Sequence, residues 1–272
     1  MEIFEDQSAH RQIASAFLAA RASASGLSAY PGAIPQTLED AYAIQDAAIA
    51  LTPAPIAGWK IGRILGPQAA HFGVDRLAGP ILSPRLTRPG EGHPPAMPVF
   101  AAGFAAVEAE WLLRLGADAD PARMRYTLAE AAELIDAVHV GIEIASSPFA
   151  GINDLGAAVT ISDFGNNHGL VIGAAVGAAD YARWPVSMGV DGAIVGTGSG
   201  ADLPDGPIGA VCFLLELLAA RRIALRAGQW ISTGAITGVH PVAPGAQVEA
   251  RFGADHALRC TIEAARAGEG QS

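Results

Sequence analysis

Cysteine is scarce in this chain, and long apolar runs are absent from it. Cys212 and Cys260, the two cysteines, lie far apart in the sequence, so we expect inert thiols in a reducing compartment and not a disulfide framework. Apolar stretches such as residues 170–179 and 211–220 are shorter than the roughly 20 residues that a membrane-spanning helix needs. The acidic start also lacks the basic and apolar regions of a secretory signal. These features predict a cytoplasmic protein.

Basic residues are also few, and charged residues of both signs are sparse. The chain has 17 basic against 27 acidic residues, a formal net charge of −10. It therefore lacks the excess of positive charge that is typical of a protein that binds nucleic acid or an anionic membrane, and we expect neither partner. Several of the acids are instead candidates to hold a cation. Only 16% of the residues are charged and 51% are hydrophobic, which favours area buried between subunits and predicts a homo-oligomer.

Two helices are predicted near the start of the chain. Apolar residues recur at helical spacing over residues 8–25. Thr37 followed by two acids is a helix-start signal for a second helix over residues 41–51. Later on, short apolar runs broken by Gly and Pro are typical of β-structure. We therefore expect an N-terminal helical unit over residues 1–56 and a β-rich domain over residues 57–272.

Further elements are predicted inside the β-rich part. Apolar residues on one helical face indicate helices, and short apolar runs between Gly or Pro turns indicate strands. The expected helices span residues 127–136 and 207–227, and the expected strands span residues 138–144, 229–233, 246–252 and 257–262.

Two glutamates alternate with apolar residues in the segment VEAEW. Residues two apart in a strand point to the same face, so Glu108 and Glu110 would converge. Paired carboxylates on an apolar strand repel each other and lose hydration unless a cation or a proton compensates. Glu143 stands alone in a second apolar run, and three carboxylates with waters suit Mg²⁺ or Mn²⁺. A solvated strand face is the alternative reading of the same spacing.

Six segments in a fixed order resemble the 2-keto-4-pentenoate hydratase and 4-oxalocrotonate decarboxylase branch of the fumarylacetoacetase-like superfamily. The likeness runs from about residue 37 to residue 252, and the order and spacing of the segments carry it. In chain order they are residues 37–45 (TLEDAYAIQ), 58–62 (GWKIG), 107–111 (VEAEW), 141–144 (GIEI), 161–173 (ISDFGNNHGLVIG) and 225–245 (LRAGQWISTGAITGVHPVAPG).

The resemblance implies a set of site residues. The family's metal-binding acids fall on Glu108, Glu110 and Glu143, which would hold Mg²⁺ or Mn²⁺. The family's lysine falls on Lys60, which is the leading candidate for proton transfer or for binding a carboxylate, and a family aspartate falls on Asp163, which is a second catalytic candidate. Three further residues are candidates from their place in the matching segments: His168 as a catalytic group facing the pocket, and Thr233 and Gly234 as contacts to a substrate carboxylate.

One departure from the family pattern bears on the reaction. Where the hydratases have an aspartate before an aromatic residue and a glycine, this chain has His71 before Phe72 and Gly73. The resemblance implies that this aspartate assists proton transfer in the hydratases. An imidazole that titrates near neutral pH would take over this role, and a surface histidine without function is the alternative.

The resemblance also implies a fold and an activity. The fold is of the α+β class, a mixed curved β-fold of the fumarylacetoacetase C-terminal type with peripheral helices and an N-terminal helical unit. The activity is that of a divalent-metal-dependent hydratase, a lyase that adds water to a 2-hydroxy-2,4-dienoate to give a 4-hydroxy-2-oxo acid. The alternatives are a 2-oxo acid decarboxylase, an acylpyruvate-type hydrolase, and a non-catalytic paralogue that binds metal and ligand. In each case the expected partner is a small 2-oxo acid or dienoate.

Overall fold

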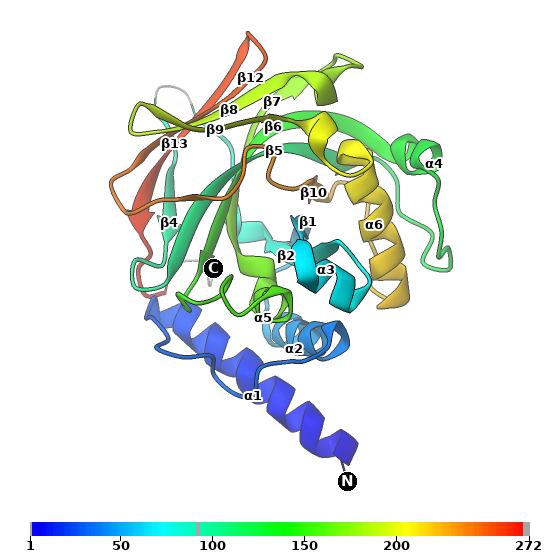
Figure 1. Ribbon diagram of the computed structural model, residues 1–272, viewed down its shortest axis with the longest axis vertical. Helices are drawn as coiled ribbons and strands as arrows, with labels where there is room; N and C mark the ends of the chain where they lie inside the picture. Colours follow the sequence, from blue (N-terminus) through cyan, green and yellow to red (C-terminus); the bar gives the residue numbers. More distant parts are fainter. Residues whose placement is uncertain (1, 91–92, 269–272) are drawn as a thin grey trace.

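The strand that carries the first two glutamates lies in the middle of a strongly curled sheet. This strand, β5, pairs antiparallel with β6 along almost its whole length. The protein is described by a computed structural model that covers residues 2–90 and 93–268, and the curled sheet is prominent in it (Figure 1). The strand order is β2 (Arg76–Leu82), β1 (Ile56–Arg63), β10 (Trp230–Ser232), β5 (Phe104–Leu115), β6 (Ile135–Ser147), β7 (Asn167–Val176) and β3 (Leu86–Thr87), with β11 (His240–Pro241) also paired to β5.

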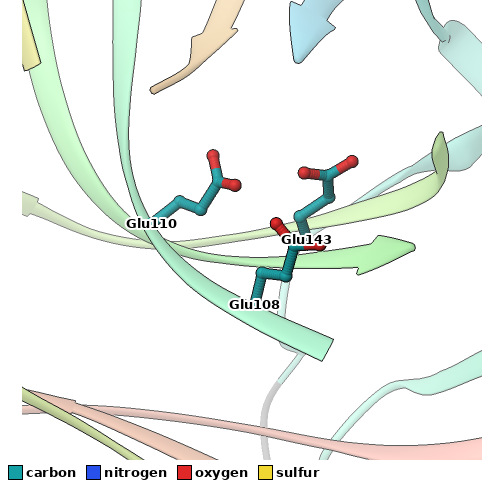
Figure 2. A group of neighbouring side chains, drawn as sticks. All are labelled: Glu108, Glu110 and Glu143. Carbon is teal, nitrogen blue, oxygen red and sulfur yellow. The ribbon is translucent and has the colours of Figure 1, made fainter. Parts of the chain in front are cut away.

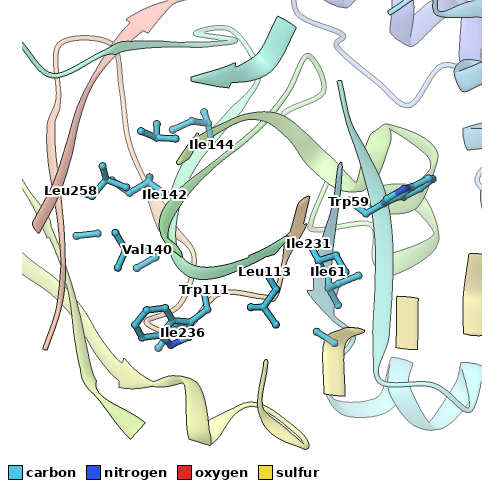
Figure 3. Close-up of a cluster of buried hydrophobic side chains, with 14 of the residues drawn as sticks. Trp59, Ile61, Trp111, Leu113, Val140, Ile142, Ile144, Ile231, Ile236 and Leu258 are labelled. Carbon is cyan, nitrogen blue, oxygen red and sulfur yellow. The ribbon is translucent and has the colours of Figure 1, made fainter. Parts of the chain in front are cut away.

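A second, smaller sheet covers one face of the curled sheet. Its order is β4 (Ala96–Val99), β13 (His256–Ala264), β12 (Gln247–Phe252), β8 (Pro185–Val190) and β9 (Ala193–Ser199). Trp111 and Ile142 from the curled sheet pack in one hydrophobic cluster with Phe252 and Leu258 from the second sheet. Figure 3 shows this cluster on the outer side of the curl. The odd-numbered residues of β5 therefore enter the main core, and its glutamates lie on the opposite face.

Six α-helices are peripheral to the sheets in the described residues. They are α1 (Glu2–Ser23), α2 (Leu38–Leu51), α3 (Gly66–Phe72), α4 (Leu128–Glu133), α5 (Ala157–Ser162) and α6 (Gly206–Ala220). Helix α6 adds Val211 and Leu214 to the main core. Helices α1 and α2 lie at one end of the molecule, where α1 extends away from the sheets (Figure 1). None of the described helices is long and apolar enough to cross a membrane.

The sequence predicted the positions of these elements better than their ends. Thr37 caps α2 as expected, because its hydroxyl accepts a hydrogen bond from the Asp40 N–H at 3.1 Å. The prediction for residues 127–136 was too long, since α4 ends at Glu133 and β6 begins at Ile135. The helix predicted over residues 207–227 ends at Ala220, because Arg222 adopts a left-handed φ of 58°. The short helices α3 and α5 were not predicted.

Two further expectations concern the cysteines and the division of the chain. Cys212 and Cys260 are free, the former half-buried and the latter buried. The boundary between a helical unit and a β-rich domain near residue 57 stays a prediction. Gln45 on α2 donates hydrogen bonds to the carbonyls of Ala78 and Ile161, at 3.0 and 2.9 Å. The N-terminal helices are therefore bonded directly to the β-rich part.

Gly79 on β2 allows the backbone of this strand to lie directly against the backbone at Phe164. It pairs with Lys60, and a Cβ at this position would overlap the carbonyl oxygen of Phe164. We predict that Gly79→Ala lowers the free energy of unfolding by about 2 kcal/mol or more, because backbone on both sides cannot yield as a side chain would. Urea denaturation measures this change. Gly177→Ala is the control, since a Cβ there meets nothing within 4 Å, and equal stability of the two variants would contradict the packing argument.

Candidate metal centre and adjoining cavity

Three buried carboxylates converge on the face of the curled sheet opposite the main core. Glu108 on β5 is paired directly with Glu143 on β6, and Glu110 follows two residues later on the same face. One oxygen from each of the three lies within 4.8 Å of the others, and Figure 2 shows the side chains approaching one another. Glu110 and Glu143 have no exposed surface, and Glu108 is 5% exposed. The solvated strand face considered from the sequence is therefore excluded.

Two of the carboxylates have one oxygen held by the protein and one left without a donor. Glu110 Oε2 accepts from the Ser232 hydroxyl at 2.5 Å and from the Gly234 N–H at 2.8 Å. Glu143 Oε1 accepts from the Asn167 amide at 2.9 Å. Glu110 Oε1 and Glu143 Oε2 are buried without a hydrogen-bond partner. Buried acceptors normally have a partner, so a cation between these oxygens fits the site.

Lys60 places an ammonium group beside the three acids. It lies on β1, is 4% exposed, and its Nζ is 3.5 Å from Glu143 Oε2. Burial alone would lower the pKa of Lys60, but the negative charges of Glu143, Glu108 and Glu110 outweigh it and raise that pKa. Lys60 is also the only lysine in the chain, beside 16 arginines. This position therefore uses a flexible amine where the rest of the chain uses guanidinium groups.

A single ammonium does not neutralise three buried acids. Burial, followed by the charge of Glu143, raises the pKa of Glu108 to about 7. Burial and the charges of Glu143 and Glu108 raise the pKa of Glu110 well above its usual range. In the absence of a cation the group therefore retains protons near neutral pH. An all-oxygen donor set of this kind matches the preference of Mg²⁺ and Mn²⁺.

Asp163 and His168, predicted as catalytic residues, lie together around an arginine from α1. Asp163 accepts from Arg21 Nε at 2.6 Å and from Nη2 at 2.9 Å. His168 Nδ1 is 3.1 Å from Arg21 Nη1 and accepts from it, because a guanidinium group only donates. The guanidinium also lies over the rings of Phe100 and Phe164. The structure thus brings the two residues to each other and leaves Asp163 in an ion pair.

A turn of unusual backbone leads from Asp163 into β7. Phe164, Gly165 and Asn166 all have φ between 56° and 66°, a conformation that is unfavourable for the two non-glycine residues. The turn directs the next residue, Asn167, toward Glu143. Asn167 therefore connects the carboxylate site with the Arg21 cluster, because its carbonyl also accepts from Arg21 Nη1 at 3.2 Å.

The remaining candidate residues have separate positions. The Thr233 hydroxyl donates to the Trp111 carbonyl at 2.9 Å, and the Gly234 N–H is bonded to Glu110, as described above. His71 is exposed on α3 and contacts Phe72, as the alternative of a surface histidine expects. Ser232, Asn167 and Arg21 were not assigned a role from sequence. The first two lie inside matching segments, whereas Arg21 stands in an Ala-rich helix without a distinguishing pattern.

A cavity of about 600 Å³ adjoins the carboxylate site. Asn167 connects the two, since it lines the cavity and bonds to Glu143. The three glutamates and Lys60 are almost fully buried and do not line it. The lining residues come from α1, the segment after α2, the region around the end of β2, and the start of β7, and they are Leu18, Arg21, Ala22, Leu51, Thr52, Pro53, Ala54, Pro55, Pro80, Leu82, Ser83, Pro84, Arg85, Phe164, Asn167 and His168.

Solved structures with the same arrangement define the fold. Over 94% of this chain and 97% of the other, the structure is similar to 4-oxalocrotonate decarboxylase from Pseudomonas putida G7 complexed with calcium and acetate, with a TM-score of 0.76 and 22% identity. The same decarboxylase complexed with magnesium and adipate gives 0.76 and 21%, over 93% of this chain and 97% of the other. Fumarylpyruvate hydrolase from Pseudomonas aeruginosa in complex with Mn²⁺ and pyruvate gives 0.54 and 18%, over 78% and 91%. The chain has the fumarylacetoacetase-like fold, which confirms the predicted α+β class.

Sequence comparison leads to the same branch over a shorter segment. A stretch of 67 residues is 40% identical to 4-oxalocrotonate decarboxylase from Pseudomonas sp. (strain CF600), and this match covers 25% of each chain. No family model matches the chain. The relatives thus include metal-bound enzymes and agree with the resemblance seen in the sequence motifs.

The carboxylate site predicts a specific dependence of stability on pH. Glu108 has a folded-state pKa of about 7, whereas its ordinary pKa is 4.5. Between pH 4.5 and pH 7 the metal-free folded protein therefore keeps a proton on Glu108 that the unfolded chain releases. We predict that metal-free protein loses stability as pH rises from about 5 to about 7. Thermal denaturation at several pH values measures this loss, and Glu108→Gln should reduce it.

Metal should reverse this loss. Free Mg²⁺ or Mn²⁺ at about 100 times its Kd should raise Tm by roughly 5–10 °C at pH 7.5, because ions bind the ionised carboxylates of the folded state only. Glu110→Gln should remove most of this rise. An equal rise in that variant would place the ion elsewhere.

Proposed function

We propose that this protein is a divalent-metal-dependent lyase that decarboxylates an unsaturated dicarboxylic 2-oxo acid of the 4-oxalocrotonate type. One observation carries the proposal: three convergent carboxylates and a single ammonium are closed off from solvent. Among the described residues around this group, the other titratable candidates are engaged or distant. Asp163 is paired with Arg21, and His71 is exposed on α3.

The reaction needs an electron sink and one proton. In a 2-oxohex-3-enedioate, the bond between C5 and C6 breaks and its electron pair moves through the conjugated system to the C2 oxygen. CO₂ leaves, and the dienolate takes up one proton to give 2-hydroxypenta-2,4-dienoate or its 2-oxo tautomer. A divalent cation held by Glu108, Glu110 and Glu143 would supply positive charge where the negative charge of the dienolate develops.

The chain's own residues then have distinct roles. Ser232 and Gly234 bond to Glu110 Oε2, and Asn167 bonds to Glu143 Oε1. These bonds fix the orientation of both carboxylates and therefore the position of the other oxygen of each. Lys60 holds a proton at Nζ within the site and is the candidate donor for the dienolate. Burial excludes water, and it favours loss of a charged carboxylate as neutral CO₂.

Hydration of a 2-hydroxy-2,4-dienoate is the second candidate, and it is the activity first expected from the motifs. The retained glutamates and Lys60 favour it equally. It also needs a water molecule to be admitted and deprotonated, which the closed site and the exposed position of His71 do not favour. An acylpyruvate-type hydrolase meets the same requirement. The homo-oligomer expected from the low charged fraction remains part of this proposal, as does a cytoplasmic location.

A product assay distinguishes these candidates. Metal-loaded protein incubated with 2-oxohex-3-enedioate should release CO₂ in step with loss of substrate absorbance, and metal removal should abolish the release. Uptake of one water by 2-hydroxypenta-2,4-dienoate, without CO₂ from the dicarboxylate, would establish the hydratase. Neither reaction, with metal binding intact, would favour a non-catalytic paralogue.

Lys60 offers a matched pair of variants. Lys60→Ala should lower kcat by about 10²- to 10⁴-fold, the range of general acid–base catalysis, with metal affinity kept. Lys60→Arg keeps the positive charge beside Glu143, but its planar guanidinium does not place a donor where the compact ammonium group of Lys60 lies, so it should lose as much activity. Activity near wild type in Lys60→Arg would make Lys60 a countercharge and not a proton donor.

A further inference from the structure

One largely buried arginine from α1 bonds to three segments that surround Glu143. The Arg21 side chain is 10% exposed. Its guanidinium donates to the Asp163 carboxylate before β7 and to the Asn167 carbonyl at the start of β7. It also donates to the carbonyl of Ser146 on β6 at 3.4 Å, three residues after Glu143. The N-terminal helix is therefore bonded into the polar surroundings of the carboxylate site.

The turn that leads to Asn167 has an unfavourable backbone and needs support. Three consecutive residues, 164–166, have φ between 56° and 66°, and only the middle one is a glycine. Such a backbone persists only where the surrounding structure holds it in place. Asp163 precedes the turn and Asn167 follows it, and Arg21 is bonded to the two residues at 2.6 and 3.2 Å. One guanidinium group thus holds both ends of the turn.

Asn167 connects this support to the carboxylate site. Its amide donates to Glu143 Oε1 at 2.9 Å. Asn167 is 4% exposed and Glu143 has no exposed surface, so bulk water does not compete for this bond. Hydrogen bonds to the second oxygen of a metal-binding carboxylate orient it, and their loss commonly weakens metal binding. A turn that relaxes would withdraw Asn167 and leave Glu143 without this orientation.

We propose that Arg21 is a positioning residue of the metal centre, which holds Asn167 against Glu143 and thereby sets the affinity for a divalent cation. The inference rests on the metal centre of the proposed function, and it holds for whichever reaction that centre catalyses. Asp163, a catalytic candidate from the sequence, acts in this proposal as the counter-ion of Arg21. Its side chain is 1% exposed and accepts from two nitrogens of the guanidinium, which fixes the direction of the other donors.

The affinity of metal-free protein for Mn²⁺, measured by calorimetry without substrate, tests the proposal. Arg21→Lys keeps a positive charge beside Asp163, so the fold should persist. An ammonium group lacks the planar fork of donors that bonds to Asp163 and Asn167 together. Arg21→Lys should therefore weaken Mn²⁺ binding about tenfold, and Asn167→Ala should weaken it by about 10- to 100-fold.

A double variant shows whether Arg21 acts through Asn167. Once the Asn167 amide is absent, support of the turn no longer reaches Glu143. The double variant Arg21→Lys/Asn167→Ala should therefore bind Mn²⁺ about as weakly as Asn167→Ala alone. A loss equal to the product of the two single losses would mean that the residues act independently, and it would overturn the proposal.

Arg221→Lys is the matched control for a purely structural role. The Arg221 side chain is 9% exposed and bonds to Gln45 and Asp46 on α2, and in the described part of the chain it bonds to no residue of the carboxylate site. Arg221→Lys should lower Tm and leave the Mn²⁺ affinity unchanged. An unchanged affinity in Arg21→Lys, or an equal loss in Arg221→Lys, would overturn the proposal. Failure of wild type to bind Mn²⁺ would overturn the metal centre and this inference with it.

Discussion

The mutual repulsion of three buried carboxylates is the constraint on which the rest of the structure depends. Glu108, Glu110 and Glu143 are removed from water on one face of a sheet whose other face is the main hydrophobic core. Lys60 offsets one charge, and protons or a cation must offset the others. The fold maintains this unfavourable group because long, directly paired strands fix β5 against β6, and the second sheet and α6 supply apolar burial on the far side.

The hydrogen bonds around the carboxylates fix the orientation of Glu110 and Glu143. Ser232 and Gly234 hold one oxygen of Glu110, and Asn167 holds one oxygen of Glu143. Of the opposite oxygens, Glu110 Oε1 has no hydrogen-bond partner, and Glu143 Oε2 has only the ammonium of Lys60 nearby, at 3.5 Å. Asn167 is positioned by a turn with three left-handed residues and by Arg21 from α1. The metal-binding face, the cavity and the N-terminal helix are thereby connected through a few buried polar contacts.

The sequence was most informative where a local pattern and a family motif coincide. The period-two alternation of VEAEW placed Glu108 and Glu110 on one face, and GIEI supplied Glu143, while GWKIG supplied Lys60. The Arg21 cluster could not be predicted because the hydrogen-bond partners of Arg21 are more than 120 residues away in sequence. Asp163 and His168 were predicted as catalytic from their place in a motif, but their bonds to Arg21 depend on how α1 packs. Element ends such as that of α6 depended on single left-handed residues, which the apolar pattern does not reveal.

The central claim is that the three carboxylates hold one divalent cation, and anomalous X-ray diffraction from crystals soaked in Mn²⁺ tests it most directly. The account predicts a single strong anomalous peak between the free oxygens of Glu110 and Glu143 and an oxygen of Glu108, at about 2.0–2.3 Å from each. A peak at another position would contradict the account. So would the absence of a peak at saturating Mn²⁺ and a pH at which the acids are ionised.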